Sequence, residues 1–288
     1  MTSTKGACSV CGHRTPVYLR TYSGEALCII CLERALIKSI KRAIGITGAL
    51  KPREPVLVPI TLASPSYSLA LARLVSIVER KFGSKVIIAV PEPLAADTLE
   101  LLPRDAEAVI AKLYLTQTEL KAMSSFECLR LDRRWSIQAA RHLGVKAVAL
   151  PFTRTELLLI ALEALFNGDK EALTDSSLRF TVGDVVAFNA LALVEAEAVA
   201  AYAYLKGYLG IGPLCPIRLQ SKIAFYSIAT RRPELEFSGY KTLGILLERA
   251  YRDGRICAAC GGLSTSRYGE FCSYCSRLGE VKVEILSP

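Results

Sequence analysis

The sequence lacks an uninterrupted apolar stretch that could cross a membrane. Its longest apolar run, residues 185–204, contains Asn189, Glu195 and Glu197, and polar groups of this kind are unfavourable in a bilayer. We therefore expect a long buried helix over residues 184–206. The first eight residues are polar and lack the apolar core of a secretory signal. Both absences favour a cytoplasmic protein with no membrane-bound part.

Acidic residues are scarce relative to basic ones. The chain has 36 Lys and Arg residues against 27 Asp and Glu residues, which gives a formal net charge of +9. This balance favours an anionic partner, most simply nucleic acid, although a basic surface without a defined partner explains it equally well. With 51% hydrophobic and 22% charged residues, the chain is globular rather than disordered.

The third absence concerns glycine in one loop. Residues 55–60 are a short β-rich apolar run and residues 69–80 an apolar helical pattern, which together predict the first strand, loop and helix of an α/β nucleotide-binding domain. Phosphate-binding loops at this place usually contain glycines, because backbone N–H groups must approach the anion. The loop at 61–68 has neither glycine nor charge, and Pro65 removes one N–H donor. The position of this loop predicts a nucleotide-binding site, but its lack of glycine and charge argues against one.

Cysteines, by contrast, are plentiful and regularly spaced. Ten are present, and eight of them form four C-x-x-C pairs. Two such pairs close together are typical of a zinc ribbon in a reducing compartment. We expect two structural zinc ions, held by Cys8, Cys11, Cys28 and Cys31 and by Cys257, Cys260, Cys272 and Cys275. The remaining two, Cys128 and Cys215, are also expected to stay reduced.

Between the two cysteine sets, the sequence predicts an α/β core. Further strands are expected at 85–90, 106–115 and 147–150, although the second of these is alanine-rich enough for a helix. Helices are expected at 32–44, 133–143, 155–166, 215–230 and 240–252. Alternating strands and helices indicate a parallel sheet covered on both faces. We expect domains at 1–49 (ribbon and helix), 50–210 (α/β core), 211–256 (helical) and 257–288 (ribbon).

The expected helix at 32–44 has two different faces. Its apolar residues share one face, and four basic residues lie away from it: Arg34, Lys38, Lys41 and Arg42. This basic face is either a phosphate-contacting surface or an ordinary solvated one.

In this order, the features resemble the tRNA 2-thiouridine synthetases of the TtuA and cytosolic thiouridylase type, which contain an adenine-nucleotide alpha-hydrolase domain. The local matches cover nearly the whole chain: the knuckle at 22–31, Cys128 with Arg133-Arg134, Gly168-Asp169, Cys215-Pro216 and the ribbon at 257–275. The resemblance implies a Rossmann-like parallel sheet, activation of a tRNA uridine by ATP, and sulfur delivery from a carrier. It also implies three cysteines that hold an iron–sulfur cluster or relay sulfur.

The sequence departs from this family at three parts of the implied active site. The SGGxDS loop is replaced by 61–68, whose hydroxyl side chains include Thr61, Ser64, Ser66 and Ser68. The GHN-x-DD element is replaced by 151–156, with Glu156 as its only acid, and the first cysteine of the C-x-x-C element is Ser125. A cluster that needs three thiolates would have only two. We therefore expect neither ATP nor an iron–sulfur cluster to bind.

Three functions remain open at this point. The first is a non-catalytic paralogue that binds tRNA, or pairs with an active homologue as a homo- or heterodimer. The second is an active ATP-dependent tRNA sulfurtransferase with a divergent loop, in which Cys128 and Cys215 act as the catalytic persulfide and relay pair. Alternatively, both cysteines have no catalytic role and pack as small buried apolar side chains. The third is a zinc-ribbon regulator that binds DNA or RNA.

Overall fold

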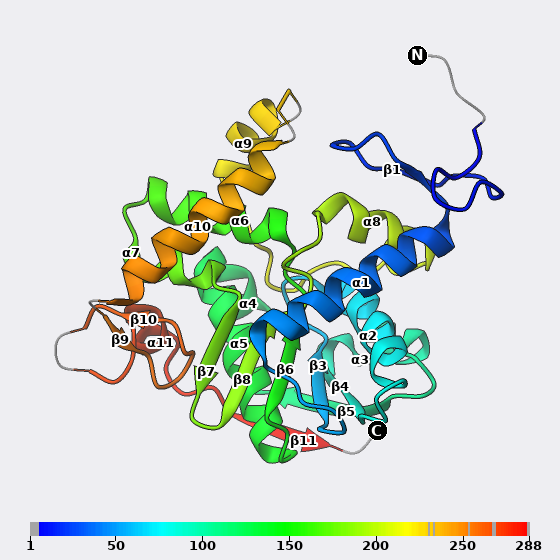
Figure 1. Cartoon of the computed structure of the whole chain (residues 1–288). Helices are drawn as coiled ribbons and strands as arrows, with labels where there is room; N and C mark the ends of the chain where they lie inside the picture. Colours follow the sequence, from blue (N-terminus) through cyan, green and yellow to red (C-terminus); the bar gives the residue numbers. More distant parts are fainter. Residues whose placement is uncertain (1–5, 230, 233, 253, 267–268, 287–288) are drawn as a thin grey trace.

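The computed structural model describes residues 6–229, 231–232, 234–252, 254–266 and 269–286. A seven-stranded sheet lies at its centre (Figure 1). The spatial order is β11 (Val283–Leu286), β5 (Glu107–Leu113), β4 (Val86–Pro91), β3 (Val56–Pro59), β6 (Ala147–Leu150), β8 (Val185–Asn189) and β7 (Arg179–Val182). The five inner strands are parallel, and the edge strands β11 and β7 are antiparallel to their neighbours. The predicted α/β class is therefore confirmed.

The inner strands form where the sequence has short apolar runs. Every residue of β3, β4 and β6 is buried, as expected for parallel strands that are covered on both faces. The strands predicted at 55–60, 85–90, 106–115 and 147–150 are all present.

Helices cover the sheet. Those in the first half of the chain are α1 (Ile29–Thr47), α2 (Pro65–Glu79), α3 (Glu92–Thr98), α4 (Gln117–Ala122) and α5 (Ser125–His142). The others are α6 (Arg154–Phe166), α7 (Lys170–Leu173), α8 (Ala196–Leu205), α9 (Ser221–Ala229), α10 (Glu234–Arg252) and α11 (Ser273–Leu278). Two 3₁₀ turns are η1 (Leu99–Leu101) and η2 (Thr174–Ser176). Because the strand order reverses at β3, right-handed crossovers place α2 and α5 on opposite faces.

The prediction of one long helix over residues 184–206 is wrong. The second strand of a β-hairpin formed by β7 and β8 occupies its first part, and only Ala196–Leu205 is helical. The hairpin turns at Gly183, whose φ of 62° suits glycine, and pairs Val182 with Val185. The Gly183-Asp184 pair was an available turn signal. Val185–Asn189 is apolar because it is a buried strand between β6 and β7, and such a run has no period that separates it from a helix.

Three other helices begin six or more residues away from the expected position. α5 begins at Ser125 rather than 133, because Ser124 and Glu127 form a capping box. α9 begins at Ser221, after an irregular segment that includes Cys215, and α10 begins at Glu234. The predicted end of the helix at residue 230 lies outside the described residues.

Each cysteine set belongs to a small ribbon with its own two-stranded sheet. β1 (Tyr18–Leu19) pairs with β2 (Ala26–Leu27), and β9 (Arg255–Ile256) pairs with β10 (Leu263–Ser264). After the second ribbon, the chain returns to the central sheet as β11. None of the described helices is long and apolar enough to cross a membrane.

Candidate functional site

The loop between β3 and α2 is held by its own hydroxyl groups. Thr61 N–H donates to Ser68 Oγ over 3.0 Å, and Ser64 N–H donates to Thr61 Oγ1 over 3.2 Å. The Thr61 and Ser68 hydroxyls also hydrogen-bond each other at 2.9 Å. Both residues are fully buried. These two hydroxyls belong to the segment that stands in place of the SGGxDS loop, and they hold the loop itself.

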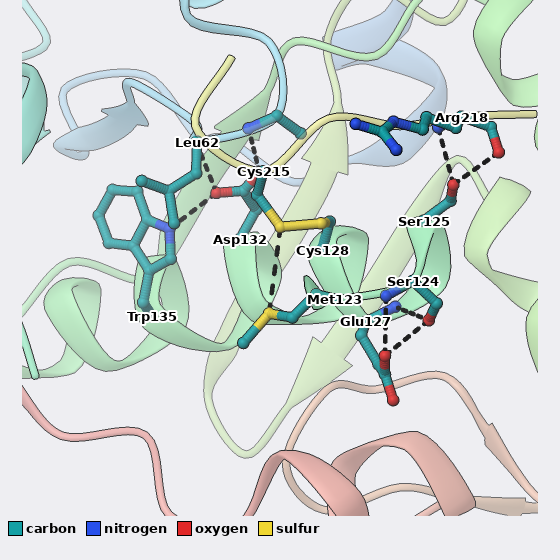
Figure 2. The surroundings of a disulfide bond; sticks show 11 residues. Leu62, Met123, Ser124, Ser125, Glu127, Cys128, Asp132, Trp135, Cys215 and Arg218 are labelled. Atoms are coloured by element: carbon teal, nitrogen blue, oxygen red, sulfur yellow. Dashed lines mark hydrogen bonds between the residues drawn. A yellow bond between two sulfur atoms is a disulfide. The ribbon is translucent and has the colours of Figure 1, made fainter. Parts of the chain in front are cut away.

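The next two N–H groups of the loop bind a carboxylate from α5. Leu62 N–H donates to Asp132 Oδ1 over 2.8 Å, and Ala63 N–H donates to Oδ2 over 3.0 Å (Figure 2). Trp135 Nε1–H adds a third bond of 2.9 Å to Oδ1. Asp132 is 1% exposed, and burial raises its pKa to about 6 against the lowering effect of these donors. The protein thus supplies its own anion to the loop.

Cys128 and Cys215 form a disulfide bond (Figure 2). Their Cα atoms lie 5.7 Å apart, within the range that a disulfide requires. The expectation that all ten cysteines stay reduced is therefore wrong for this pair. The error arose because 87 positions separate the two residues, and only the folded chain brings them together. Both cysteines are fully buried, so a thiol from solution reaches the bond only if the surrounding chain opens.

The segment that carries Cys215, residues 211–218, crosses the loop, and we call it the strap. Leu214 N–H and Cys215 N–H both donate to the Leu62 carbonyl, over 2.9 and 3.3 Å. At one end of the strap, Ser66 Oγ donates to the Ile211 carbonyl over 3.1 Å. At the other end, Ser125 Oγ bonds both the carbonyl and the N–H of Arg218, at 2.9 and 2.8 Å (Figure 2). The strap therefore covers the loop and is fixed at both ends.

A cavity of about 230 Å³ remains beside the strap. It lies where β3 and β6 end, which is the switch point at which α/β folds bind ligands. Its lining includes Ser64, Tyr67, Glu156, Lys222 and Tyr226. The Glu156 carboxylate accepts the N–H and hydroxyl of Thr153, at 2.8 and 2.7 Å, in the capping box of α6. Burial raises the pKa of Glu156. Glu156, the one acidic residue of segment 151–156, thus caps helix α6.

The two cysteine sets each form a compact cluster. The four sulfur atoms of each set lie within 4.8 Å of one another. Cys11 and Cys28 Sγ are 3.9 Å apart, and so are Cys260 and Cys272 Sγ. A tetrahedral ion with metal–sulfur bonds of about 2.3 Å holds its sulfur ligands about 3.8 Å apart. Each set therefore has the spacing of a site for a single metal ion.

Buried arginines of α5 bind the second cluster. Arg130 Nη1 donates to Cys272 Sγ over 2.6 Å, and its Nε donates to Asp175 over 2.9 Å. Arg133 also donates to Asp175 over 2.9 Å and to the Cys260 carbonyl over 3.3 Å. Arg130 is fully buried. These cations offset the negative charge of four thiolates, as hydrogen-bonding groups around metal ligands do.

No protein-family model matches the chain, and a search of curated proteins finds no match. Among solved structures, it is similar to the U34-tRNA thiolase NcsA from Methanococcus maripaludis with its [4Fe-4S] cluster. The match covers 98% of this chain and 99% of that one, with a TM-score of 0.72 and 18% identity. The chain has the fold of this thiolase. The predicted architecture, a Rossmann-like sheet with a cysteine ribbon at each end, is thereby confirmed.

The residues around the disulfide do not fit an iron–sulfur cluster. Eight of the ten cysteines belong to the two compact clusters, which leaves Cys128 and Cys215 for this place. The resemblance implies three thiolates here, and the third position is Ser125. Its hydroxyl already bonds the backbone of Arg218 on two sides.

Sequence reasoning missed the two side chains that organise this site. Asp132 and Arg130 lie on the first half of α5, which the sequence placed outside a helix. A signal was available, because Ser124 followed by Glu127 has the capping-box spacing. With α5 begun at Ser125, residues 128 and 132 lie one turn apart on the same face. Nothing in the sequence identifies the loop amides as the partners of Asp132.

Proposed function

We propose that this chain is a tRNA-binding protein of the tRNA thiolation class that does not use ATP. The likeness in fold over the whole chain supports the class. The absence of ATP binding in this proposal rests on the Asp132 carboxylate, which already accepts the N–H groups of Leu62 and Ala63. A phosphate needs such free backbone donors at this place. In this proposal, activation of the uridine falls to a second subunit that resembles the intact enzyme.

A basic surface for the RNA backbone lies on α1. Four of its basic residues are exposed: Arg34, Lys38, Lys41 and Arg42. The one acid of this helix, Glu33, is already bonded to the Tyr202 hydroxyl over 2.8 Å. With a net charge of +9, this surface suits phosphate contacts that position an RNA without reading its sequence. We assign the protein to the cytoplasm, where tRNA is modified.

The two cysteine clusters suit structural zinc. Four thiolates and no other ligand make a closed tetrahedral site, which is the usual arrangement for structural zinc. The sulfur distances of 3.9 Å fit one ion. Metal analysis should give two zinc ions per chain and no visible absorption band. A brown protein with stoichiometric iron would overturn this assignment.

The proposal is tested by two titrations of the zinc-loaded full-length chain. Calorimetry with Mg-ATP should show no binding, beside clear binding by an intact thiolase as the control. Labelled tRNA should bind at 50 mM salt, and its affinity should fall steeply with added salt as counterions are released. The control for the second titration is a DNA duplex of equal length. Equal affinity for both nucleic acids would favour a general nucleic-acid regulator, and micromolar ATP binding would refute the proposal.

The disulfide favours a second candidate, an active sulfurtransferase. In a relay, one thiol carries the transferred sulfur as a persulfide. The other thiolate attacks the inner sulfur of this persulfide, which breaks the S–S bond, releases the outer sulfur as hydrogen sulfide toward the tRNA and leaves a disulfide that an external thiol reduces before the next cycle. Cys128 and Cys215 are close enough to do this. Their full burial means that the strap must open for each cycle. If replacing both cysteines with serine abolishes tRNA thiolation in a complemented cell, this candidate replaces the first.

A further inference from the structure

A second cavity lies away from the strap, between α1 and α2. Its volume is about 220 Å³, and its lining includes Lys41, Ile44, Leu50, Val78, Glu79 and Phe82. The chain enters β3 at Val56 just after this lining and enters β4 at Val86 just after Phe82. The cavity is therefore at the amino ends of these strands, whereas the strap lies at their carboxyl ends. α1 packs against α2 in this part of the molecule (Figure 1).

Besides two lysines, the lining of this largely apolar cavity carries one acidic group, the carboxyl group of Glu79. The residue is 3% exposed, and burial raises its pKa, while a hydrogen bond from Ser84 and the charge of Lys41 lower it. The Ser84 hydroxyl accepts Arg53 N–H over 3.1 Å, which leaves its proton for Glu79. A carboxylate has about four acceptor positions. Among the described residues, the hydrogen bond given for this carboxylate comes from Ser84, and its further acceptor positions are suited to receive N–H groups from a ligand.

An aromatic ring and two lysines stand at the cavity edge. Phe82 is 47% exposed and offers a flat apolar face. Lys41 Nζ lies 5.8 Å from the centre of this ring, and Lys51 is also part of the lining. Aromatic side chains of this kind stack on nucleic-acid bases, and neighbouring cations contact phosphate. The exposed Lys38 and Arg42 of α1 continue the positive charge away from the cavity.

We infer that this cavity binds a guanine ring. Guanine carries two adjacent N–H donors on one edge, at N1 and the 2-amino group, and a carboxylate accepts both. Adenine, cytosine and uracil each present one donor beside an acceptor, which the Glu79 carboxylate would repel. The ring would stack on Phe82, and its phosphate would lie against Lys41 and Lys51. The guanine belongs either to a free nucleotide or to an unpaired position of an RNA, and the RNA source depends on the tRNA binding proposed above.

The first test uses nucleotides and the zinc-loaded full-length protein. GMP should bind roughly 5- to 150-fold more tightly than AMP, CMP or UMP, because a bidentate base contact discriminates by about 1–3 kcal/mol. IMP, which lacks the 2-amino group, should bind at an intermediate level. Equal binding of all five nucleotides, or no GMP binding at 5 mM, would overturn the inference.

Two variants locate the site. Phe82→Ala should weaken GMP binding about 10-fold, since stacking contributes about 1–3 kcal/mol per base. Because the Phe82 side chain is partly exposed, the variant should still fold. The matched control is Phe166→Ala, which removes a 68% exposed ring on α6. Glu79→Gln should remove the preference for GMP over IMP. A Phe82→Ala protein that binds GMP like the Phe166→Ala control would contradict the assignment.

The RNA arm compares a single-stranded RNA loop containing guanosine with the same loop containing inosine. Preference for guanosine that is lost in Phe82→Ala supports an RNA base as the ligand. Preference for GMP without preference between the loops overturns the RNA source and leaves a free nucleotide. Salt-dependent tRNA binding that is unchanged in Phe82→Ala, together with no GMP preference, refutes this site while the proposed tRNA binding stands.

Discussion

Replacing Asp132 with alanine removes the anion that the protein supplies to its own loop. Three buried donors lose their acceptor: Leu62 N–H, Ala63 N–H and Trp135 Nε1–H. Each buried unsatisfied donor costs about 1–3 kcal/mol. Because water and small movements satisfy part of this, we expect the free energy of unfolding to fall by about 3–5 kcal/mol. At about 2–4 °C per kcal/mol, that is a decrease in Tm of about 6–20 °C.

Urea unfolding followed by tryptophan fluorescence measures this effect. Trp135 is the only tryptophan in the chain, and its indole bonds the group that is removed, so the same signal reports unfolding and the local change. Asp97→Ala is the matched control, since Asp97 is an exposed carboxylate on α3. Its unfolding free energy should stay within about 0.5 kcal/mol of the wild type.

Added phosphate distinguishes an anion site from a general loss of packing. The Asp132→Ala loop has two free N–H groups in front of α2, where an anion is favoured. If phosphate binds there with a Kd of about 10 mM, 100 mM phosphate restores about 1.4 kcal/mol. Potassium chloride at equal ionic strength should restore nothing. Loss of less than about 1 kcal/mol in Asp132→Ala would refute the idea that its carboxylate satisfies the loop.

Three further predictions concern the surroundings of this loop. Replacing Cys128 and Cys215 with serine should lower the free energy of unfolding by about 3–5 kcal/mol, because their bond closes a loop of 87 residues; urea midpoints that do not change with reductant would contradict this. Arg130→Gln should weaken metal binding at the second cluster about 10–100-fold by removing the donor to Cys272. Chelator competition measures it, the first cluster is the internal control, and equal loss from both would count against a local effect. The raised pKa of Asp132, about 6, means that the folded state keeps a proton that the unfolded state loses from about pH 4. Stability should therefore fall by about 2–3 kcal/mol as pH rises from 4 to 6, relative to Asp132→Asn, and parallel curves for the two proteins would disprove this.

Local sequence patterns predicted the centre of the fold well. The strands β3, β4 and β6 are wholly buried, so their apolar runs could be recognised without knowing their neighbours. The cysteine spacing likewise predicted two compact clusters, which the structure forms. In both cases, the signal lies within a few consecutive residues.

The sequence was uninformative where distant segments meet. β8 was taken for a helix because its apolar run has no period, and only its neighbours in the sheet make it a strand. The bond between Cys128 and Cys215 and the contact of Asp132 with Leu62 depend on residues 70 or more positions apart. The lack of glycine in the loop was visible in the sequence. The carboxylate that accepts the N–H groups of this loop was not.

The first half of α5 has a consequence for how this protein could change over generations. Within one helix, Cys128 bonds the strap, Arg130 bonds the second cluster and Asp132 bonds the loop. A variant in which this loop binds phosphate would first have to lose Asp132, and that step alone removes a large part of an average protein's stability of 5–15 kcal/mol. The protein without Asp132 would be less stable before any nucleotide could bind and offset the lost stability. The internal carboxylate therefore makes any stepwise change of this loop toward phosphate binding costly in stability.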